Sequence, residues 1–214
     1  MPHRAPSPRT EIRRKPQRGH YDRATIDAIV DAAVLCHIAF AHGGSVHCLP
    51  TACWRDGDYL YIHGANNSRM VQALLEAECS VAITHLDGLV LARSAFHHSM
   101  NFRSVVIYGR FAAVDEPAPK ATAFRQFVDH VSPGRAAQVR EPSPAELAGT
   151  RLLRIPLAEA AAKVRNWGVE EAAEDLAVPV WAGVIPLALR AGAPERDPVC
   201  ESAVVPPRPA WLAE

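Results

Sequence analysis

The chain lacks the features that mark several large classes of protein. Its 23 basic and 23 acidic residues cancel, so no net field favours nucleic acid or an acidic membrane surface as a partner. No apolar run is long enough to cross a bilayer, and the N-terminus has no apolar segment of the kind that a secretory signal needs. We therefore expect a protein that acts without nucleic acid and without a membrane.

Common nucleotide and metal motifs are also missing. There is no G-x-G-x-x-G fingerprint and no Walker A sequence, which argues against Rossmann and P-loop sites. The ten histidines include the pair His97-His98 and the group His42, His47 and Cys48, but none has H-x-x-x-H or finger spacing. We expect no metal.

The five cysteines are odd in number and contain no C-x-x-C pair. Cys36, Cys48 and Cys79 stand among apolar residues and are interpreted as small core side chains. The cysteines therefore give no sign of a disulfide framework, and we predict a reducing compartment, the cytoplasm.

The length of 214 residues favours one domain with a substantial core. The first 20 residues are rich in arginine and proline and have almost no apolar residue, so they are predicted to form a flexible basic arm. Residues 21–214 are predicted to form a single domain that ends in an irregular, proline-rich tail.

Short alternating segments dominate the pattern of this domain. They predict strands over residues 34–41, 45–54, 59–63, 79–85, 89–92, 105–114, 151–156 and 178–189, with a turn at 86–88. Helical spacing predicts helices over 21–33, 68–77, 118–130 and 143–149, while 158–165 fits either state. The chain is therefore predicted to be mainly β with α additions, as an antiparallel barrel.

Two polar clusters interrupt this pattern. The first lies between apolar segments 88–92 and 105–111 and holds Arg93, Ser94, His97, His98, Ser99, Asn101, Arg103 and Ser104. Such donors suit an anionic or highly polar ligand, and a solvated hairpin tip is the alternative. In the second cluster, Ser68 and Arg69 start a helix directly after a strand and a Gly/Asn turn. That arrangement predicts an anion seat, and an ordinary helix cap is the alternative.

The order of these segments resembles a known family. The runs GDYLYIHG, ANNSRM, LDGLVLARSAFHHSMNFRSVVIYGR, HVSPGR, AAKVR and PVWAGVIPL, within residues 21–187, are similar to the pyridoxamine 5′-phosphate oxidase-like proteins. The likeness is to their flavin-nucleotide-binding branch, which is itself similar to the nitroimidazole-resistance proteins. It implies a split β-barrel that binds FMN, as a homodimer with two flavins at the subunit interface.

The resemblance also implies a set of cofactor-binding residues. Ser68 and Arg69 would hold the FMN phosphate, with His63, Gly64 and Met70 around them. Leu49, Pro50 and Thr51 would run along the flavin ring. Arg103 and Ser104 would contact the phosphate or the ring edge, and Trp181 is either a flavin wall or a plain core or interface aromatic.

Two positions depart from the true oxidases. Those enzymes show a basic residue where this chain has Met70, and an arginine near the position of His47. We therefore expect an FMN-dependent oxidoreductase that passes hydride or electrons from NAD(P)H or another donor to a small organic acceptor, other than the true oxidase. A non-catalytic flavin carrier or sensor and a haem-binding split barrel are the alternatives. No catalytic acid is assigned, although His63, His98 and Lys163 are polar groups near the expected open side.

Overall fold

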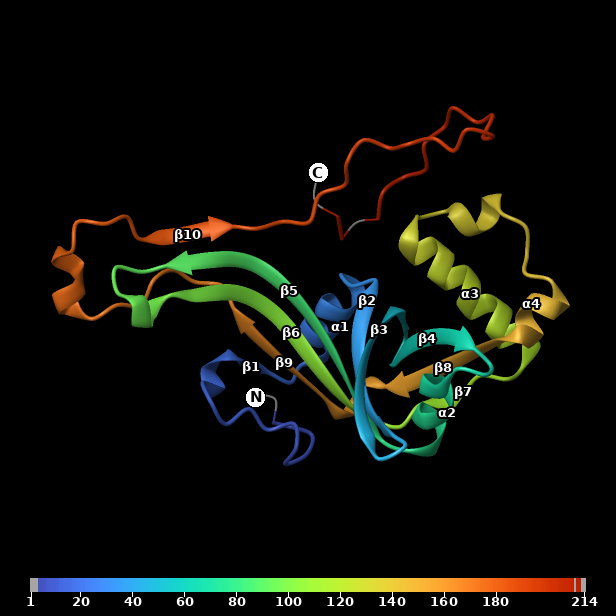
Figure 1. Cartoon of the computed structure of the whole chain (residues 1–214), viewed down its shortest axis with the longest axis horizontal. Coiled ribbons are helices and arrows are strands. Elements are labelled where there is room, and N and C mark those ends of the chain that lie inside the picture. Colours follow the sequence, from blue (N-terminus) through green and yellow to red (C-terminus); the bar gives the residue numbers. More distant parts are fainter. Residues whose placement is uncertain (1–3, 210, 213–214) are drawn as a thin grey trace.

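The computed structural model describes residues 4–209 and 211–212. Its framework is an antiparallel sheet of ten strands that curls into a half-barrel, with the strand order β1-β9-β6-β5-β2-β3-β4-β8-β7 and with β10 paired to β5 (Figure 1). The strands are β1 (Gly19–His20), β2 (Leu35–His42), β3 (Ser45–Asp56), β4 (Tyr59–Ala65), β5 (Cys79–Leu91), β6 (Ser99–Gly109), β7 (Ala112–Ala113), β8 (Thr150–Pro156), β9 (Ala160–Arg165) and β10 (Gly183–Pro186). This arrangement confirms the predicted fold class.

Four α-helices accompany the sheet: α1 (Arg23–Asp31), α2 (Arg69–Glu76), α3 (Pro117–Val131) and α4 (Pro144–Gly149). Two of them begin at side-chain caps. The Asp22 side chain accepts a hydrogen bond from the Thr25 N–H at 2.8 Å, and Ser143 and Glu146 form a complete capping box. These two helices therefore start where a first free N–H group finds a local acceptor.

The core lies between the inner face of the sheet and the helices α1 and α2. Alternate residues of the strands point inward, so that Ile38, Leu60 and Ile107 are fully buried. Val71 and Leu74 from α2 join the same cluster. Burial of these side chains is the main source of stability for the barrel.

The strand β5 runs through the position where the sequence predicts a turn. It pairs with β6 from Cys79 opposite Gly109 to Val90 opposite Ser99, and its register shifts between Leu86 and Gly88. The predicted turn at 86–88 is therefore wrong, and a bulge at Asp87 stands in its place. The cause is a long-range contact, because the Asp87 carboxylate accepts two hydrogen bonds of 2.9 Å from Arg103.

Beyond the barrel, the far halves of β5 and β6 form a projecting arm (Figure 1). The same edge of β5 pairs with β2 over residues 80–82 and with β10 over residues 88–91. The strand β10 is shorter than the predicted 178–189, because Pro179 and Pro186 lack the N–H group that a ladder needs.

The N-terminal segment also differs from its prediction. Residues 4–20 lie against the sheet: Thr10 is buried, Arg9 pairs with Glu78 and Glu159, and β1 pairs with β9. Ion pairs and main-chain bonds make these contacts, so hydrophobic periodicity could not reveal them. The segment predicted as a mobile arm therefore has a specific place on the barrel.

The burial of the cysteines differs from the prediction at Cys48. Cys36 and Cys79 are buried as expected, but Cys48 is exposed, because the β2–β3 hairpin projects at that point. Cys53 is buried beside Cys36, and the hydrogen bond between their side chains raises the pKa of Cys36. No helix of the described residues is long and apolar enough to span a membrane.

The contact between β4 and α2 generates a prediction at Gly64. A Cβ atom added there would lie 2.9 Å from Val71 Cγ2, a buried β-branched side chain that cannot turn away easily. Gly64→Ala should therefore destabilise the fold by about 1–3 kcal/mol through overpacking. Urea denaturation measures the loss. Gly149→Ala, where no atom lies within 4 Å of the new Cβ, is the control and should be nearly neutral; equal stability of both variants would contradict the close contact.

Candidate functional site

The predicted anion seat forms where β4 leads into α2. Ser68 is the extended N-cap residue of that helix, and its side chain makes no capping hydrogen bond. The first helical bond runs from the Gln72 N–H to the Ser68 carbonyl, so the N–H groups of Arg69, Met70 and Val71 have no partner within the helix. Arg69 is exposed and forms no ion pair with any described residue. A free hydroxyl, a free guanidinium and the positive end of a helix thus meet at one place.

A small pocket of about 150 Å³ opens beside this seat. It is lined by Phe40, His42, His47, Leu49, Ser68, Arg69 and Met70. The structure therefore brings together four of the predicted cofactor-binding residues. The sequence analysis did not name Phe40, His42 and His47 as part of that set; the signal was the hairpin, since Phe40 and His47 are register partners whose rings stack at 5.3 Å.

Two further predicted residues, Pro50 and Thr51, continue along β3 from Leu49. Pro50 is exposed and Thr51 is half-buried. They therefore offer an open edge next to the anion seat rather than a closed cavity.

Three predicted residues lie away from the seat within one chain. Arg103 is bound to Asp87 in a groove of about 440 Å³, and the Ser104 hydroxyl donates to the Lys163 carbonyl at 3.3 Å. Trp181 is 63% exposed and stands on the arm next to Gly183. The arm carries these side chains away from Ser68 and Arg69.

The first polar cluster is also rearranged by partners that the sequence could not show. Arg93 binds the buried carboxylate of Glu171 at 2.5 Å, and Arg103 binds Asp87. The Ser94 hydroxyl lies 2.7 Å from Nδ1 of His97. Within one chain both arginines are therefore already paired with carboxylates, and the prediction that these donors form one open anion site stays a prediction.

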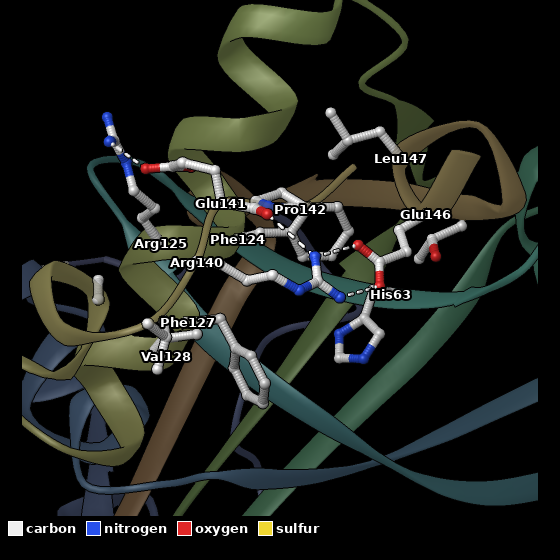
Figure 2. Close-up of a pocket in the computed structure, with 13 residues that line it drawn as sticks. His63, Phe124, Arg125, Phe127, Val128, Arg140, Glu141, Pro142, Glu146 and Leu147 are labelled. Atoms are coloured by element: carbon white, nitrogen blue, oxygen red, sulfur yellow. Dashed lines mark hydrogen bonds and ion pairs between the residues drawn. The ribbon is translucent and has the colours of Figure 1, made fainter. Parts of the chain in front are cut away.

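A larger pocket of about 460 Å³ lies on the other side of β4, beneath α3 and α4 (Figure 2). Most of its lining is apolar: Phe124, Phe127, Val128, Val139, Pro142 and Leu147. His63 stands in this wall, with its ring 5.2 Å from the ring of Phe127. His63 thus belongs to this pocket and not to the anion seat.

The imidazole of His63 has unusual surroundings. Burial lowers its pKa, which favours the neutral ring. Its Nδ1 atom is buried without a hydrogen-bond partner, and so is Nε1 of the neighbouring Trp54. Unsatisfied buried nitrogens are costly. Because Nδ1 is closed off from the pocket, Nε2 is the ring nitrogen that remains accessible to a bound group, and it makes no hydrogen bond with the described residues.

Two ion pairs stand at the polar side of the same pocket (Figure 2). Arg140 binds Glu146 at 2.6 Å and Arg125 binds Glu141 at 2.8 Å. The Arg140 guanidinium, together with the Ser143 N–H, lowers the pKa of Glu146 to about 2. Two guanidiniums, each paired with a glutamate, therefore stand beside an apolar cavity.

The sequence analysis missed this pocket. It predicted a helix over residues 118–130 from helical spacing and named His63 only as a polar group near the open side. The other polar candidates lie elsewhere: His98 is on the exposed arm, and the Lys163 ammonium donates to the Arg14 carbonyl at 3.1 Å. No group of side chains that could hold a metal ion occurs in the described part of the chain.

Comparison with solved structures identifies close relatives. The structure of the flavocytochrome Anf3 from Azotobacter vinelandii is 38% identical over 97% of this chain and 96% of that chain, with a TM-score of 0.89. The structure of an FAD and haem binding protein from Mycobacterium smegmatis is 33% identical over 89% of this chain and 94% of that chain, with a TM-score of 0.84.

A more distant likeness concerns the fold alone. A putative 5-nitroimidazole antibiotic resistance protein from Bacteroides thetaiotaomicron is 17% identical over 68% of this chain and 86% of that chain, with a TM-score of 0.58. No curated protein matches the chain.

A family model also matches the chain. The model described as pyridoxamine 5′-phosphate oxidase matches residues 22–164, which include the barrel, the anion seat and most of the lining of the larger pocket. The relatives at 33% and 38% identity share the same split barrel over nearly the whole chain. This chain therefore belongs to the pyridoxamine 5′-phosphate oxidase family of split β-barrel proteins.

Proposed function

We propose that this chain is a flavin-dependent oxidoreductase that also holds a haem, and that it passes hydride or electrons to a small organic acceptor. The observation that supports a haem site is the apolar pocket around the imidazole of His63, which has no hydrogen-bond partner among the described residues. The names of two relatives, a flavocytochrome and an FAD and haem binding protein, support the combination. The predicted cytoplasmic location remains part of this proposal.

The chemistry of the larger pocket suits a haem. Neutral imidazole is the form that ligates iron, and burial keeps His63 in that form. Phe124, Phe127 and Val128 supply apolar contacts for a macrocycle. Arg125 and Arg140 can bind carboxylates at the edge of the pocket, in exchange for their present glutamate partners. When bound, the haem would supply one-electron chemistry at its iron.

The anion seat suits the phosphate end of a flavin nucleotide. Ser68, Arg69 and the first N–H groups of α2 can bind phosphate oxygens, and Leu49 lines the same pocket. We propose FMN as the flavin that this single seat requires. FAD, which the M. smegmatis relative is named for, would need a second phosphate contact beyond it.

The scattered flavin residues favour a homodimer as part of this proposal. Within one chain Arg103, Ser104 and Trp181 do not reach the anion seat, and Leu49 and Pro50 are exposed. A second copy could place its own arm over the open edge of β3 and complete the flavin site. The exposed apolar residues Leu89, Met100 and Ile185 on the arm would be covered in the same contact.

A non-catalytic flavin carrier or sensor is the second candidate, since the same pocket would serve it. Mixing the holo-protein with NAD(P)H in the absence of oxygen separates the two. The proposed enzyme should lose its flavin colour within seconds to minutes and regain it when an acceptor is added. A flavin that stays oxidised with NAD(P)H but is reduced by dithionite would favour the carrier for this donor.

Arg69 provides the test of the flavin seat. If it clamps the phosphate, Arg69→Ala should weaken FMN binding by about 1.5–3 kcal/mol, or roughly tenfold to a hundredfold. Riboflavin, which lacks the phosphate, should bind equally to both proteins. Fluorescence titration of each flavin measures the two affinities, and unchanged FMN affinity would remove Arg69 from the seat.

His63 provides the test of the haem site. His63→Ala, reconstituted with haem, should lose the intense absorbance band of ligated iron, and added imidazole should restore it by filling the vacated position. His98→Ala is the control, because His98 is exposed on the arm and should leave the spectrum unchanged. A folded His63→Ala protein, judged by circular dichroism, that keeps the parent spectrum would show that another group holds the iron.

A further inference from the structure

The distribution of charge along the chain is strongly uneven. Residues 4–18 contain six basic residues and one acidic residue, whereas the whole chain has equal numbers of each. The excess of positive charge at one end is therefore balanced by an equal negative excess over the rest of the molecule. A neutral protein with segregated charge can still attract a charged partner to one face.

The basic segment is held in a defined place. The strand β1 adds to the edge of the sheet by pairing Gly19 with Lys163, and Arg9 bridges Glu78 and Glu159 at 2.8 and 2.9 Å. Lys15 has a left-handed backbone (φ 57°) that turns the chain before β1. Arg13, Arg14 and Lys15 are therefore presented together as exposed side chains on a fixed turn.

A second, independent observation lies directly beside this turn. The guanidiniums of Arg18 and Arg165 lie 5.1 and 4.9 Å from the ring centroid of Trp167. Arg165 is 2% exposed and donates only to neutral oxygens, those of Asn101, Trp167 and Gly168. Burial first, and then the nearby charge of Arg18, lower the pKa of Arg165.

Neither guanidinium has a carboxylate partner within the described residues, and the Nε atoms of both are buried without an acceptor. Lys163 adds a further positive charge at the same place, because its ammonium donates a hydrogen bond to the Arg14 carbonyl. Glu11 pairs with Arg13 at 3.2 Å and Glu170 lies near Arg165, but positive charge at this sheet edge remains in excess, which favours an incoming anionic surface.

The residues of this surface indicate which class of anionic partner fits it best. Residues 4–20 present no large exposed apolar side chain, so the surface lacks the insertion anchor of a membrane-bound segment. The Trp167 ring beside this surface already has two guanidiniums within about 5 Å of its centroid, which compete with a base for its faces. An acidic protein face remains the best match.

We propose that the surface formed by Arg13, Arg14, Lys15, Arg18 and Lys163, here the basic surface, docks an acidic electron-carrier protein that reduces the bound flavin. The proposal rests on the flavin-dependent function proposed above. Each reduced carrier would give one electron to the flavin and be oxidised itself, so two carriers and protons from solvent complete a two-electron reduction.

The location suits electron delivery. Phe40 lines both the anion seat and the adjoining hollow of about 290 Å³ that Arg9 of the N-terminal segment borders. In Figure 1 the N-terminal segment and the tip of the β2–β3 hairpin lie at the same end of the barrel. A carrier on the basic surface would therefore approach the molecule from the side that carries the proposed flavin phosphate.

The test uses the holo-protein and a reduced plant-type [2Fe–2S] ferredoxin as an acidic carrier. Stopped-flow absorbance under argon follows flavin reduction at several salt concentrations. The second-order rate should fall steeply as salt rises, because the attraction is screened. The triple variant Arg13→Glu, Arg14→Glu, Lys15→Glu should be at least about tenfold slower at low salt, with a flattened salt dependence.

A matched control separates docking from net charge. Arg135→Glu, Arg190→Glu, Arg196→Glu changes charge equally at exposed positions away from the basic surface, and it should stay within about twofold of the parent rate. Equal rates for the parent and the first variant, or equal slowing of both variants, would overturn the proposal.

Two further measurements keep this result distinct from the proposed function. If dithionite reduces the flavin but ferredoxin does not, the docking proposal fails and the flavin function stands. If the protein binds no flavin, the proposed function fails, and calorimetric binding of oxidised ferredoxin still decides whether the basic surface docks a carrier. Binding to phosphatidylserine vesicles or single-stranded RNA without ferredoxin binding would also overturn it.

Discussion

The long pairing of β5 with β6, which continues past a bulge at Asp87, supports both parts of the molecule. Within the barrel it buries Val81 and Ile107 in the core, and beyond the barrel the same two strands become the arm. One edge of β5 pairs with β2 in the barrel and with β10 in the arm. The barrel and the arm are therefore parts of one continuous sheet. A break in that ladder would separate the proposed cofactor-binding residues on the arm from those on the barrel.

The bulge at Asp87 lets the strand continue. A one-residue shift would normally turn every later side chain to the opposite face, and the two bonds from Arg103 hold the new register in place. The strand β4 then divides the two proposed cofactor sites. Its His63 faces the apolar pocket under α3 and α4, while its end leads through Gly64 and Ser68 into the anion seat. Haem and flavin would thus lie on opposite sides of one strand, which suits exchange of electrons between them.

Local chemistry made part of this structure predictable from the sequence. The Ser68–Arg69 helix start depends on neighbouring residues and stands as predicted. The Asp22 and Ser143 caps are equally local, since each accepts a hydrogen bond from an N–H three residues ahead. Asp87-Gly88 has the composition of a tight turn, and only the distant Arg103 makes it a bulge. The partners of Arg93 and Arg9 are likewise remote in sequence. The pocket around His63 needs α3, α4 and β4 together, so no local pattern could reveal it.

The central claim is that one chain holds both a flavin and a haem. Denaturation of the purified protein, followed by mass measurement of the released small molecules, tests it most directly. We predict two chromophores, one with the mass of a flavin nucleotide and one with the mass of haem, each approaching one per chain when the protein is fully loaded. The flavin mass also decides between FMN and FAD. Release of only one chromophore, or of neither, from protein produced with both available and shown to be folded, would contradict the account.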